Sequence, residues 1–358
     1  MSEEFTELHD ELRSVARDLL GKCDRDTAPD QALLAGSGWL GLAVPAELDG
    51  AGATFAEVAV LLDEVGRAAA HGPFASMVSL GLGALDLVIP NPARDELIRA
   101  TVAGAATPIL VLSAEWDPAL PSEPGFRLES TADGLRLYGS ADFVLDAREA
   151  DRLLTPARTE DGTLALVALE PGTSVTEQPV VDATRRPGRV EFDGVEVDPE
   201  ALWHFADASA ALRRLHDRAA VTITFDSLGL SAAMLDATVE YVRVREQFGR
   251  PIGSFQAVKH ACADMLVQLT VARELARAAV RAHTTATPDA TVAISMAKSY
   301  TTEAAVRIAG TAMQLHGGMG YTWESGIHRY LKRATLNRSL FGSPIAHRHH
   351  LAARYRPE

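Results

Sequence analysis

Cysteine, aromatic side chains and positive charge are all scarce in this sequence of 358 residues. The two cysteines, Cys23 and Cys262, lie far apart, so neither a disulfide framework nor a cysteine metal site is expected. Aromatic residues make up only 6% of the chain, and the formal net charge is −14. That charge argues against a nucleic-acid partner, because nucleic-acid binders present clustered positive charge.

Segments that direct a chain to or across a membrane are also missing. The N-terminal sequence has no basic stretch followed by an apolar one, which argues against a signal peptide. The most apolar run, residues 77–90, contains glycines and Asp86 and is too short to cross a bilayer. We therefore expect a cytoplasmic protein without a membrane span.

The hydrophobic periodicity divides the chain into three segments. Apolar residues recur at three- and four-residue spacing through residues 1–107, which predicts helices. Short apolar stretches separated by turn residues fill 108–204, and Asp161-Gly162 is a hairpin signal there. Helical patterns return in 205–358 and are long; they cover residues 206–245, 254–283, 289–315 and 324–340. The order helix, strand, helix predicts a mainly α fold with a β insert.

Two motifs in the last segment stand out by their composition and spacing. Residues 244–260 read VREQFGRPIGSFQAVKH, so a helix ends in a Gly/Pro turn and a second helix follows. Residues 314–321 read QLHGGMGY, a helix end with a glycine-rich turn. Near the N-terminus, GWLGLAVP at 38–45 precedes DGAG at 49–52. Together these motifs closely resemble those of the acyl-CoA dehydrogenase superfamily, and the resemblance covers nearly the whole chain.

The resemblance implies a fold of N-terminal helices, a middle antiparallel β barrel and a C-terminal four-helix bundle. It also implies an oligomer with bound FAD and an acyl-CoA thioester substrate that is desaturated between its α and β carbons. A carboxylate removes the α-proton while hydride passes to the flavin, so the redox chemistry belongs to the cofactor. The family's usual electron acceptor is an electron-transferring flavoprotein.

The same resemblance assigns roles to residues that would clamp the ADP half of FAD. Arg245 matches the arginine that reaches the pyrophosphate, a task that suits a guanidinium. Glycines in a loop let the backbone approach phosphates closely. The complete set of matching cofactor positions, called the clamp from here on, is Arg245, Gln247, Phe248, Gln256, Gln314, Gly317 and Gly318. Within this set, Gln256 matches a position where the family places a polar contact to the flavin.

Two other parts of the family pattern are missing. The position of the catalytic glutamate is occupied by Phe341, followed by Gly342, and phenylalanine cannot accept a proton. The segment that packs on the flavin ring usually contains Gly-Ser-Asp, but residues 112–119 read LSAEWDPA. Trp116 in that segment is interpreted as ordinary packing. The family resemblance therefore assigns no catalytic residue in this chain.

A relocated base has two weak candidates. In some relatives the base lies on the helix before the clamp, at a position that falls on Ala219 here. Asp217 and Asp226 are the nearest carboxylates. Burial of Asp226 in its apolar run would raise its pKa toward that of a usable base. The plainer interpretation makes Asp217 a surface partner of Arg218 and Asp226 a structural group. His316 and the group His347, His349 and His350 lack metal-ligand spacing, so no metal is expected, and the histidine-rich C-terminal segment is interpreted as a surface helix.

The chain keeps the clamp residues but lacks the family's flavin-packing segment and its catalytic base. This combination predicts that the chain forms only half of an active site. The chain resembles the smaller, non-catalytic subunit of actinobacterial heteromeric (α2β2) acyl-CoA dehydrogenases, several of which act on steroid-derived acyl groups. A second acyl-CoA dehydrogenase-like chain would then supply the base. Two alternatives stay open: a self-sufficient homo-oligomeric dehydrogenase with a relocated carboxylate, and a flavin-free structural or binding protein of the same fold.

Overall fold

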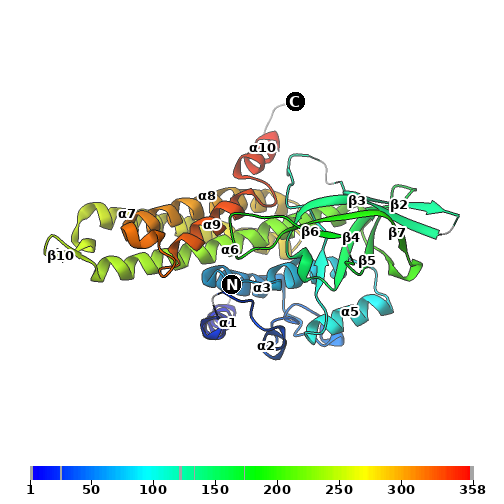
Figure 1. Cartoon of the computed structure of the whole chain (residues 1–358), viewed down its shortest axis with the longest axis horizontal. Coiled ribbons are helices and arrows are strands. Elements are labelled where there is room, and N and C mark those ends of the chain that lie inside the picture. Colours follow the sequence, from blue (N-terminus) through cyan, green and yellow to red (C-terminus); the bar gives the residue numbers. More distant parts are fainter. Residues whose placement is uncertain (1–2, 25, 121–122, 133, 173, 355–358) are drawn as a thin grey trace.

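The computed structural model describes residues 3–354 except 25, 121–122, 133 and 173, with side chains from residue 7 onward. Along its longest axis, helices occupy one end of the protein and a β sheet the other (Figure 1). This arrangement matches the predicted mainly α fold with a β insert.

Helices form the N-terminal region and lie beneath the bundle in Figure 1. Thr54 starts α3 with a capping box, in which Glu57 reaches back to the Thr54 backbone N–H. This explains why the apolar run that begins there is helical. The elements are α1 (Glu3–Lys22), α2 (Gln31–Gly36), η1 (Ala46–Leu48), α3 (Phe55–Ala68), the π-helical η2 (Ala75–Gly81), α4 (Leu82–Asp86) and α5 (Pro92–Val102).

The middle region is one sheet in the order β6-β7-β3-β2-β4-β5-β8, with β1 also paired to β4. Most pairs are antiparallel, as predicted, but β1 and β2 both pair with β4 in parallel. The predicted stretches became strands, whereas β2, β6 and β8 were not foreseen. The strands are β1 (Pro108–Leu110), β2 (Phe126–Thr131), β3 (Gly134–Val144), β4 (Arg152–Arg158), β5 (Leu164–Leu169), β6 (Val175–Glu177), β7 (Gly188–Val197) and β8 (Leu202–His204); short 3-10 turns lie at η3 (Ala147–Glu149) and η4 (Pro199–Ala201).

Four long helices form the C-terminal bundle, and each begins and ends within three residues of its predicted range. The longest, α6, is apolar enough to cross a membrane, but 89% of its most apolar window is buried inside the protein, which is typical of a core helix. The elements are α6 (Ala208–Val244), β9 (Glu246–Gln247), β10 (Arg250–Pro251), η5 (Ile252–Ser254), α7 (Gln256–Thr284), α8 (Ala290–His316), η6 (Gly317–Tyr321), α9 (Ile327–Ser339) and α10 (Pro344–Arg354).

Two glycines allow α3 and α6 to pack with their backbones in close contact. A Cβ atom on Gly229 of α6 would lie 1.7 Å from the carbonyl oxygen of Asp63 on α3. A Cβ atom on Gly66 of α3 would lie 2.1 Å from the carbonyl oxygen of Asp226 on α6. Each glycine therefore removes a clash with backbone atoms, which cannot move aside as a flexible side chain can. This contact joins the N-terminal helices to the bundle.

We predict that Gly229→Ala destabilises the protein by about 1–3 kcal/mol, because the added methyl group overpacks this helix contact. The matched control is Gly310→Ala in α8, where a Cβ atom would meet nothing within 4 Å. That control should stabilise the helix by about 0.5–1 kcal/mol, since alanine is the better helix former. Urea unfolding of both variants measures the difference; equal effects of the two substitutions would contradict the proposed contact.

Candidate functional site

The turn that carries Phe341 packs tightly between the sheet region and the bundle. The Phe341 side chain is 1% exposed, and its backbone N–H donates to the Ala114 carbonyl oxygen at 2.7 Å. Phe341 shares an apolar cluster with Leu112, Ala114 and Leu215. The ring therefore fills the space at the family's base position and lines no cavity there.

The segment that the family uses as a flavin cradle packs on α6. The Trp116 ring stacks on His216 with centroids 4.3 Å apart and planes at 17°. Arg213 covers the same indole, with its Cζ 5.1 Å from the ring centroid, and donates to the Pro118 carbonyl oxygen at 3.2 Å. Trp116 is thus packed between protein groups, as the packing interpretation predicted, although its buried Nε1–H has no hydrogen-bond partner among the described residues. The residues from 112 to 118 do not fit an isoalloxazine ring.

Two buried polar side chains fix the Phe341 turn, and the sequence analysis missed both roles. Lys298 of α8 donates to the carbonyl oxygens of Asn337 at 3.2 Å and Gly342 at 2.9 Å. His347 lies with Nε2 at 3.0 Å from the Phe341 carbonyl oxygen and Nδ1 at 3.1 Å from Ser295 Oγ. A single lysine in the apolar run 293–300 was the available signal for Lys298.

The charge states of these two groups follow from their burial. Desolvation lowers the pKa of Lys298 to about 7. Burial and the nearby Lys298 charge lower the pKa of His347 to about 3, so its ring is neutral and Nε2–H donates to the carbonyl oxygen. The interpretation of His347 as part of a surface helix is wrong, because the side chain is buried. Among the described residues, no group of His, Cys, Asp and Glu has a metal-binding arrangement.

Asp226 is a structural ion-pair residue, and the expectation that its pKa is raised is wrong. Arg333 binds it in a bidentate fork, with distances of 3.0 Å to Oδ2 and 2.5 Å to Oδ1. Asn337 donates to Oδ2 at 2.6 Å, and Arg185 lies 3.1 Å from Oδ1. Burial alone raises the pKa of Asp226, but the Arg333 and Arg185 charges outweigh it and hold the pKa well below its usual value. A carboxylate held in this way is a poor proton acceptor.

Asp217 is also buried, so the interpretation as a surface partner of Arg218 is wrong. Thr291 donates to its Oδ2 at 2.7 Å, and Arg213 Nε lies 3.4 Å from its Oδ1. Desolvation raises the pKa of Asp217, against the lowering effect of Arg213. Asp217 lies on the same side of α6 as Arg213. Because its pKa is raised and that of Asp226 is lowered, Asp217 is the better of the two candidate bases.

The clamp residues gather at the other end of the bundle. A hairpin of β9 and β10 projects there, with Phe248 at φ 54° and Gly249 at φ 74° at its tip. The Phe248 side chain is 91% exposed. Tyr241 stacks on His316 with centroids 4.4 Å apart, which joins the hairpin end of α6 to the glycine turn of η6. All seven clamp positions are exposed: Arg245, Gln247, Phe248, Gln256, Gln314, Gly317 and Gly318.

The residue types at this end fit the diphosphate and adenine of a dinucleotide. Arg245 supplies a guanidinium without an intramolecular ion pair among the described residues. Gly317 has φ 59° and ψ −138°, a conformation that favours glycine and leaves its backbone open to a ligand. An exposed aromatic ring such as Phe248 offers a stacking surface. The ADP half of FAD fits these residues, whereas the flavin half does not fit the residues around Phe341.

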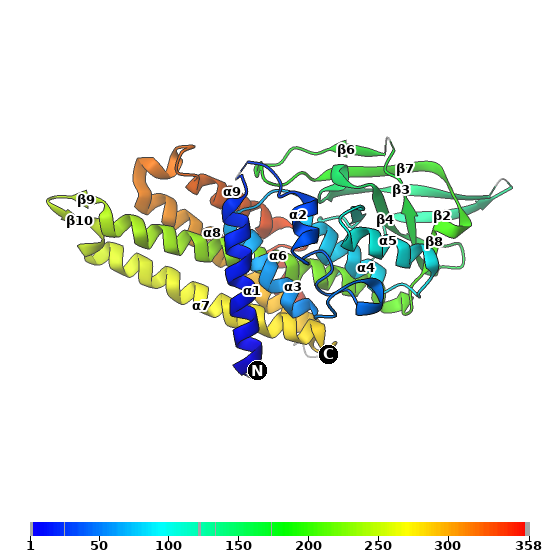
Figure 2. The ribbon, with the colours of Figure 1, turned by 90° about the horizontal axis from the view of Figure 1, so that it is seen from below.

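The clamp and the filled region lie far apart within one chain. Figures 1 and 2 place the β9–β10 hairpin at one end and the sheet at the other. Arg213, at the filled region, and Arg245, at the clamp, are 32 residues apart along α6. At 1.5 Å per residue this corresponds to about 48 Å. One chain therefore cannot bring both to the same cofactor.

Comparison with known proteins agrees with this architecture. The sequence profiles of the acyl-CoA dehydrogenase C-terminal and N-terminal domains match residues 209–355 and 2–103. The acyl-CoA dehydrogenase IpdE2 of Mycobacterium tuberculosis is 32% identical over 306 residues, which are 85% of this chain and 79% of that protein.

Two solved structures with similar folds carry the names of two proteins in their descriptions. The ChsE4–ChsE5 complex from Mycobacterium tuberculosis contains a chain with a TM-score of 0.83 and 26% identity, covering 100% of this chain and 99% of that one. The steroid acyl-CoA dehydrogenase Tcur3481–Tcur3483 gives a TM-score of 0.83 and 26% identity, with 97% of each chain covered.

Lys298 gives the turn a pH dependence that can be measured. Its pKa is about 7 in the folded protein, whereas a lysine in an unfolded chain titrates near 10.4. Between these values the unfolded chain binds a proton that the folded chain does not, so stability rises with pH. Relative to Lys298→Met, the free energy of unfolding of the native chain should rise by at most about 1.4 kcal/mol per pH unit between about pH 7 and about pH 9.

Urea unfolding at the two pH values measures this difference, and Lys259→Met, an exposed lysine of α7, serves as the control. The control should show the pH dependence of the native chain. A native protein and a Lys298→Met variant with the same pH dependence would show that Lys298 titrates as an ordinary lysine.

Proposed function

The chain belongs to the acyl-CoA dehydrogenase family, and we propose that within it the chain is the non-catalytic subunit of a heteromeric enzyme. Members of this family are FAD-dependent flavoproteins. In the proposed enzyme, this chain holds the ADP half of a FAD whose flavin lies in a partner chain. The partner also supplies the carboxylate that removes the α-proton of the acyl-CoA thioester.

The packed Phe341 turn is the observation that carries this proposal. A buried ring at the base position, joined by a backbone hydrogen bond to Ala114, leaves neither a proton acceptor nor room for a flavin there. The neighbouring carboxylate Asp226 is neutralised by Arg333 and Arg185. This side of the chain therefore provides apolar packing and hydrogen bonds between its own groups, and no carboxylate at the position of the family base.

The exposed clamp supplies the complementary half of the argument. Arg245 and Gln256 are both exposed, and neither makes an ion pair within the described residues. Phe248 is 91% exposed on a left-handed turn. An exposed aromatic ring beside an arginine and a glycine turn suits a surface that a cofactor and a second chain cover. When bound, FAD accepts the hydride, and this chain's residues orient its diphosphate.

The substrate and the assembly are proposed by analogy with the similar structures. One of them is described as a steroid acyl-CoA dehydrogenase and another as a two-chain complex. We therefore propose an α2β2 assembly in the cytoplasm that desaturates a steroid-derived or other bulky acyl-CoA. An electron-transferring flavoprotein is the acceptor that family membership suggests.

A self-sufficient enzyme is the second candidate, and the raised pKa of Asp217 is the observation that favours it. The Arg213 charge and the filled space around Trp116 weigh against it. Turnover by the chain alone that Asp217→Asn abolishes would favour this candidate. A flavin-free binding protein of the same fold would show no affinity for FAD or ADP in any assembly.

The clamp is tested with Arg245→Ala in the assembled complex of this chain and its flavin-bearing partner. Loss of charge-assisted hydrogen bonds to a diphosphate should weaken FAD retention by about tenfold to a hundredfold. The matched control is Arg307→Ala, an exposed arginine of α8 that pairs with Glu303 at 2.6 Å. FAD released on dilution, followed by its fluorescence, gives the affinity. Equal retention in both variants would remove Arg245 from the cofactor site.

A further inference from the structure

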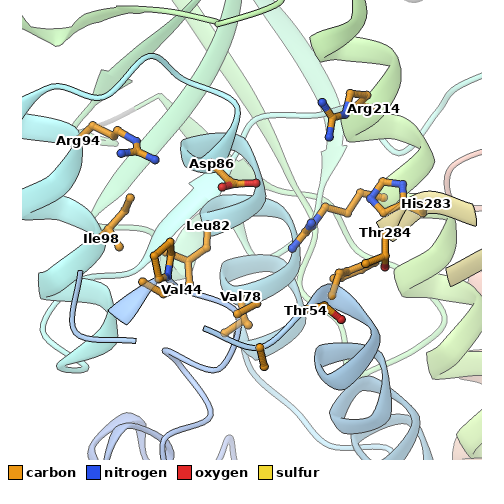
Figure 3. Close-up of a pocket in the computed structure, with 15 residues that line it drawn as sticks. Val44, Thr54, Val78, Leu82, Asp86, Arg94, Ile98, Arg214, His283 and Thr284 are labelled. Atoms are coloured by element: carbon orange, nitrogen blue, oxygen red, sulfur yellow. The ribbon is translucent and has the colours of Figure 1, made fainter. Parts of the chain in front are cut away.

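A positively charged cavity lies between the N-terminal helices and the bundle. Its volume is about 220 Å³, and Arg94, Arg214, Arg218 and His283 line it together with Asp86 and Thr54 (Figure 3). These side chains come from α5, α6, α7, α4 and the cap of α3, so elements distant in sequence converge on it. A cavity with this charge is unexpected in a chain whose formal net charge is −14.

This cavity is separate from the filled region around Phe341. Arg214 and Arg218 are one helical turn apart on α6 and share a face. Arg213 and His216 point toward Trp116 from another face of the same helix. The helix itself therefore separates the two sites, and the cavity belongs neither to the clamp nor to the position of the family base.

Two of the three guanidinium groups have no carboxylate partner within ion-pair distance among the described residues. Arg94 is neutralised, since its Nη1 lies 2.7 Å from Asp95 Oδ1. Arg218 donates from Nε to the Ser79 carbonyl oxygen at 2.5 Å, and its Cζ lies 3.9 Å from the Phe55 ring centroid. Arg214 makes neither a hydrogen bond nor an ion pair with another described residue. Two guanidinium groups without an ion pair thus face one cavity, together with the single carboxylate of Asp86.

The position of the Arg218 side chain depends on the glycine at residue 83. A Cβ atom on Gly83 would lie 2.5 Å from its Nε and 2.8 Å from its Cδ, so the absent side chain of Gly83 makes space for the guanidinium. Burial lowers the pKa of Arg218 to about 10, and the Arg214 charge adds to this effect against the attraction of Asp86. The group is still charged near neutral pH, and no carboxylate lies within ion-pair distance of it among the described residues.

His283 adds a neutral polar group to the same wall. Its ring lies edge-on to Phe55, with centroids 5.4 Å apart. Burial and the charges of Arg218 and Arg214 lower its pKa to about 3, so the imidazole is uncharged at neutral pH. A neutral imidazole has one N–H to donate. The wall therefore offers two charged donors and one neutral donor.

We propose that this cavity binds a phosphate group. Guanidinium groups bind phosphate through paired hydrogen bonds, and neighbouring positive charges are stabilised when an anion lies between them. A phosphate monoester carries close to two negative charges at neutral pH, because its second pKa is about 6. Its oxygens can accept from Arg214 and Arg218, whose combined positive charge exceeds the negative charge of Asp86. The volume exceeds the roughly 30 Å³ of one water molecule, which leaves room for the oxyanion and part of its carrier.

The experiment is isothermal titration of the full-length chain at constant ionic strength, with inorganic phosphate in one arm and glycerol 3-phosphate in the other. Arg214→Gln and Arg218→Gln should each weaken binding by about tenfold or more. Gly83→Ala should weaken it as well, since its methyl group displaces Arg218. Arg214 is exposed, so its variant keeps the protein folded even if the Arg218 variant does not.

A control variant separates this site from a general effect of surface charge. Arg186→Gln changes an exposed arginine of the sheet region. This control should keep the native affinity for the probes. Tighter binding of glycerol 3-phosphate indicates a phosphate ester as the ligand, and binding of inorganic phosphate alone indicates the free ion. No measurable binding, or native affinity in Arg214→Gln, would overturn the proposal, whatever happens to the clamp.

Discussion

The hydrogen bond from the Phe341 backbone to Ala114 holds the C-terminal turn of the bundle against the sheet region. Around it, Phe341 buries its ring, Trp116 stacks on His216, and Lys298 and His347 bind the carbonyl oxygens of the turn. Burial removes the hydration of the Lys298 amine, which costs free energy. Its hydrogen bonds to carbonyl oxygens of the turn offset part of that cost. The same contacts occupy the position that the family resemblance assigns to the base, so under the proposed function the contacts that stabilise this turn also exclude a base there.

The long helix α6 connects the region around Phe341 with the clamp. It runs from the filled region to the clamp hairpin, and it meets α3 through the glycine contact at Gly66 and Gly229. Asp226, beside that contact, is held by Arg333 of α9 and Arg185 of the loop before β7. Breaking a buried pair of this kind by removing one partner typically costs about 3–5 kcal/mol. The network fixes α6 against α9 and the loop before β7, and the proposed function depends on this fixed separation of the two ends of the helix.

Much of the fold was predictable because it rests on local signals. The ends of α6 to α9 followed from apolar periodicity and from glycine turns, and the turn after α6 from its Gly-Arg-Pro sequence, although its two short strands were not predicted. The structural role of Asp226 was one of the predicted interpretations. The partners of Asp226 and Asp217 were not predictable, since Arg333 and Thr291 lie 107 and 74 residues away in sequence. Burial was foreseen for Asp226, but burial alone gives the wrong direction for its pKa. The strand β2 was missed because its alternating pattern is broken by polar residues, and the clamp roles remain predictions that no measurement has tested.

The most direct test of the proposed function is the flavin-to-chain ratio of this protein purified alone, read from its absorbance spectrum after excess FAD is added and removed by desalting. A chain that carries only the clamp should retain almost no flavin, and should retain it only together with a partner. A ratio near one flavin per chain would contradict this account, because it would mean that the region around Phe341 opens to build a complete flavin site.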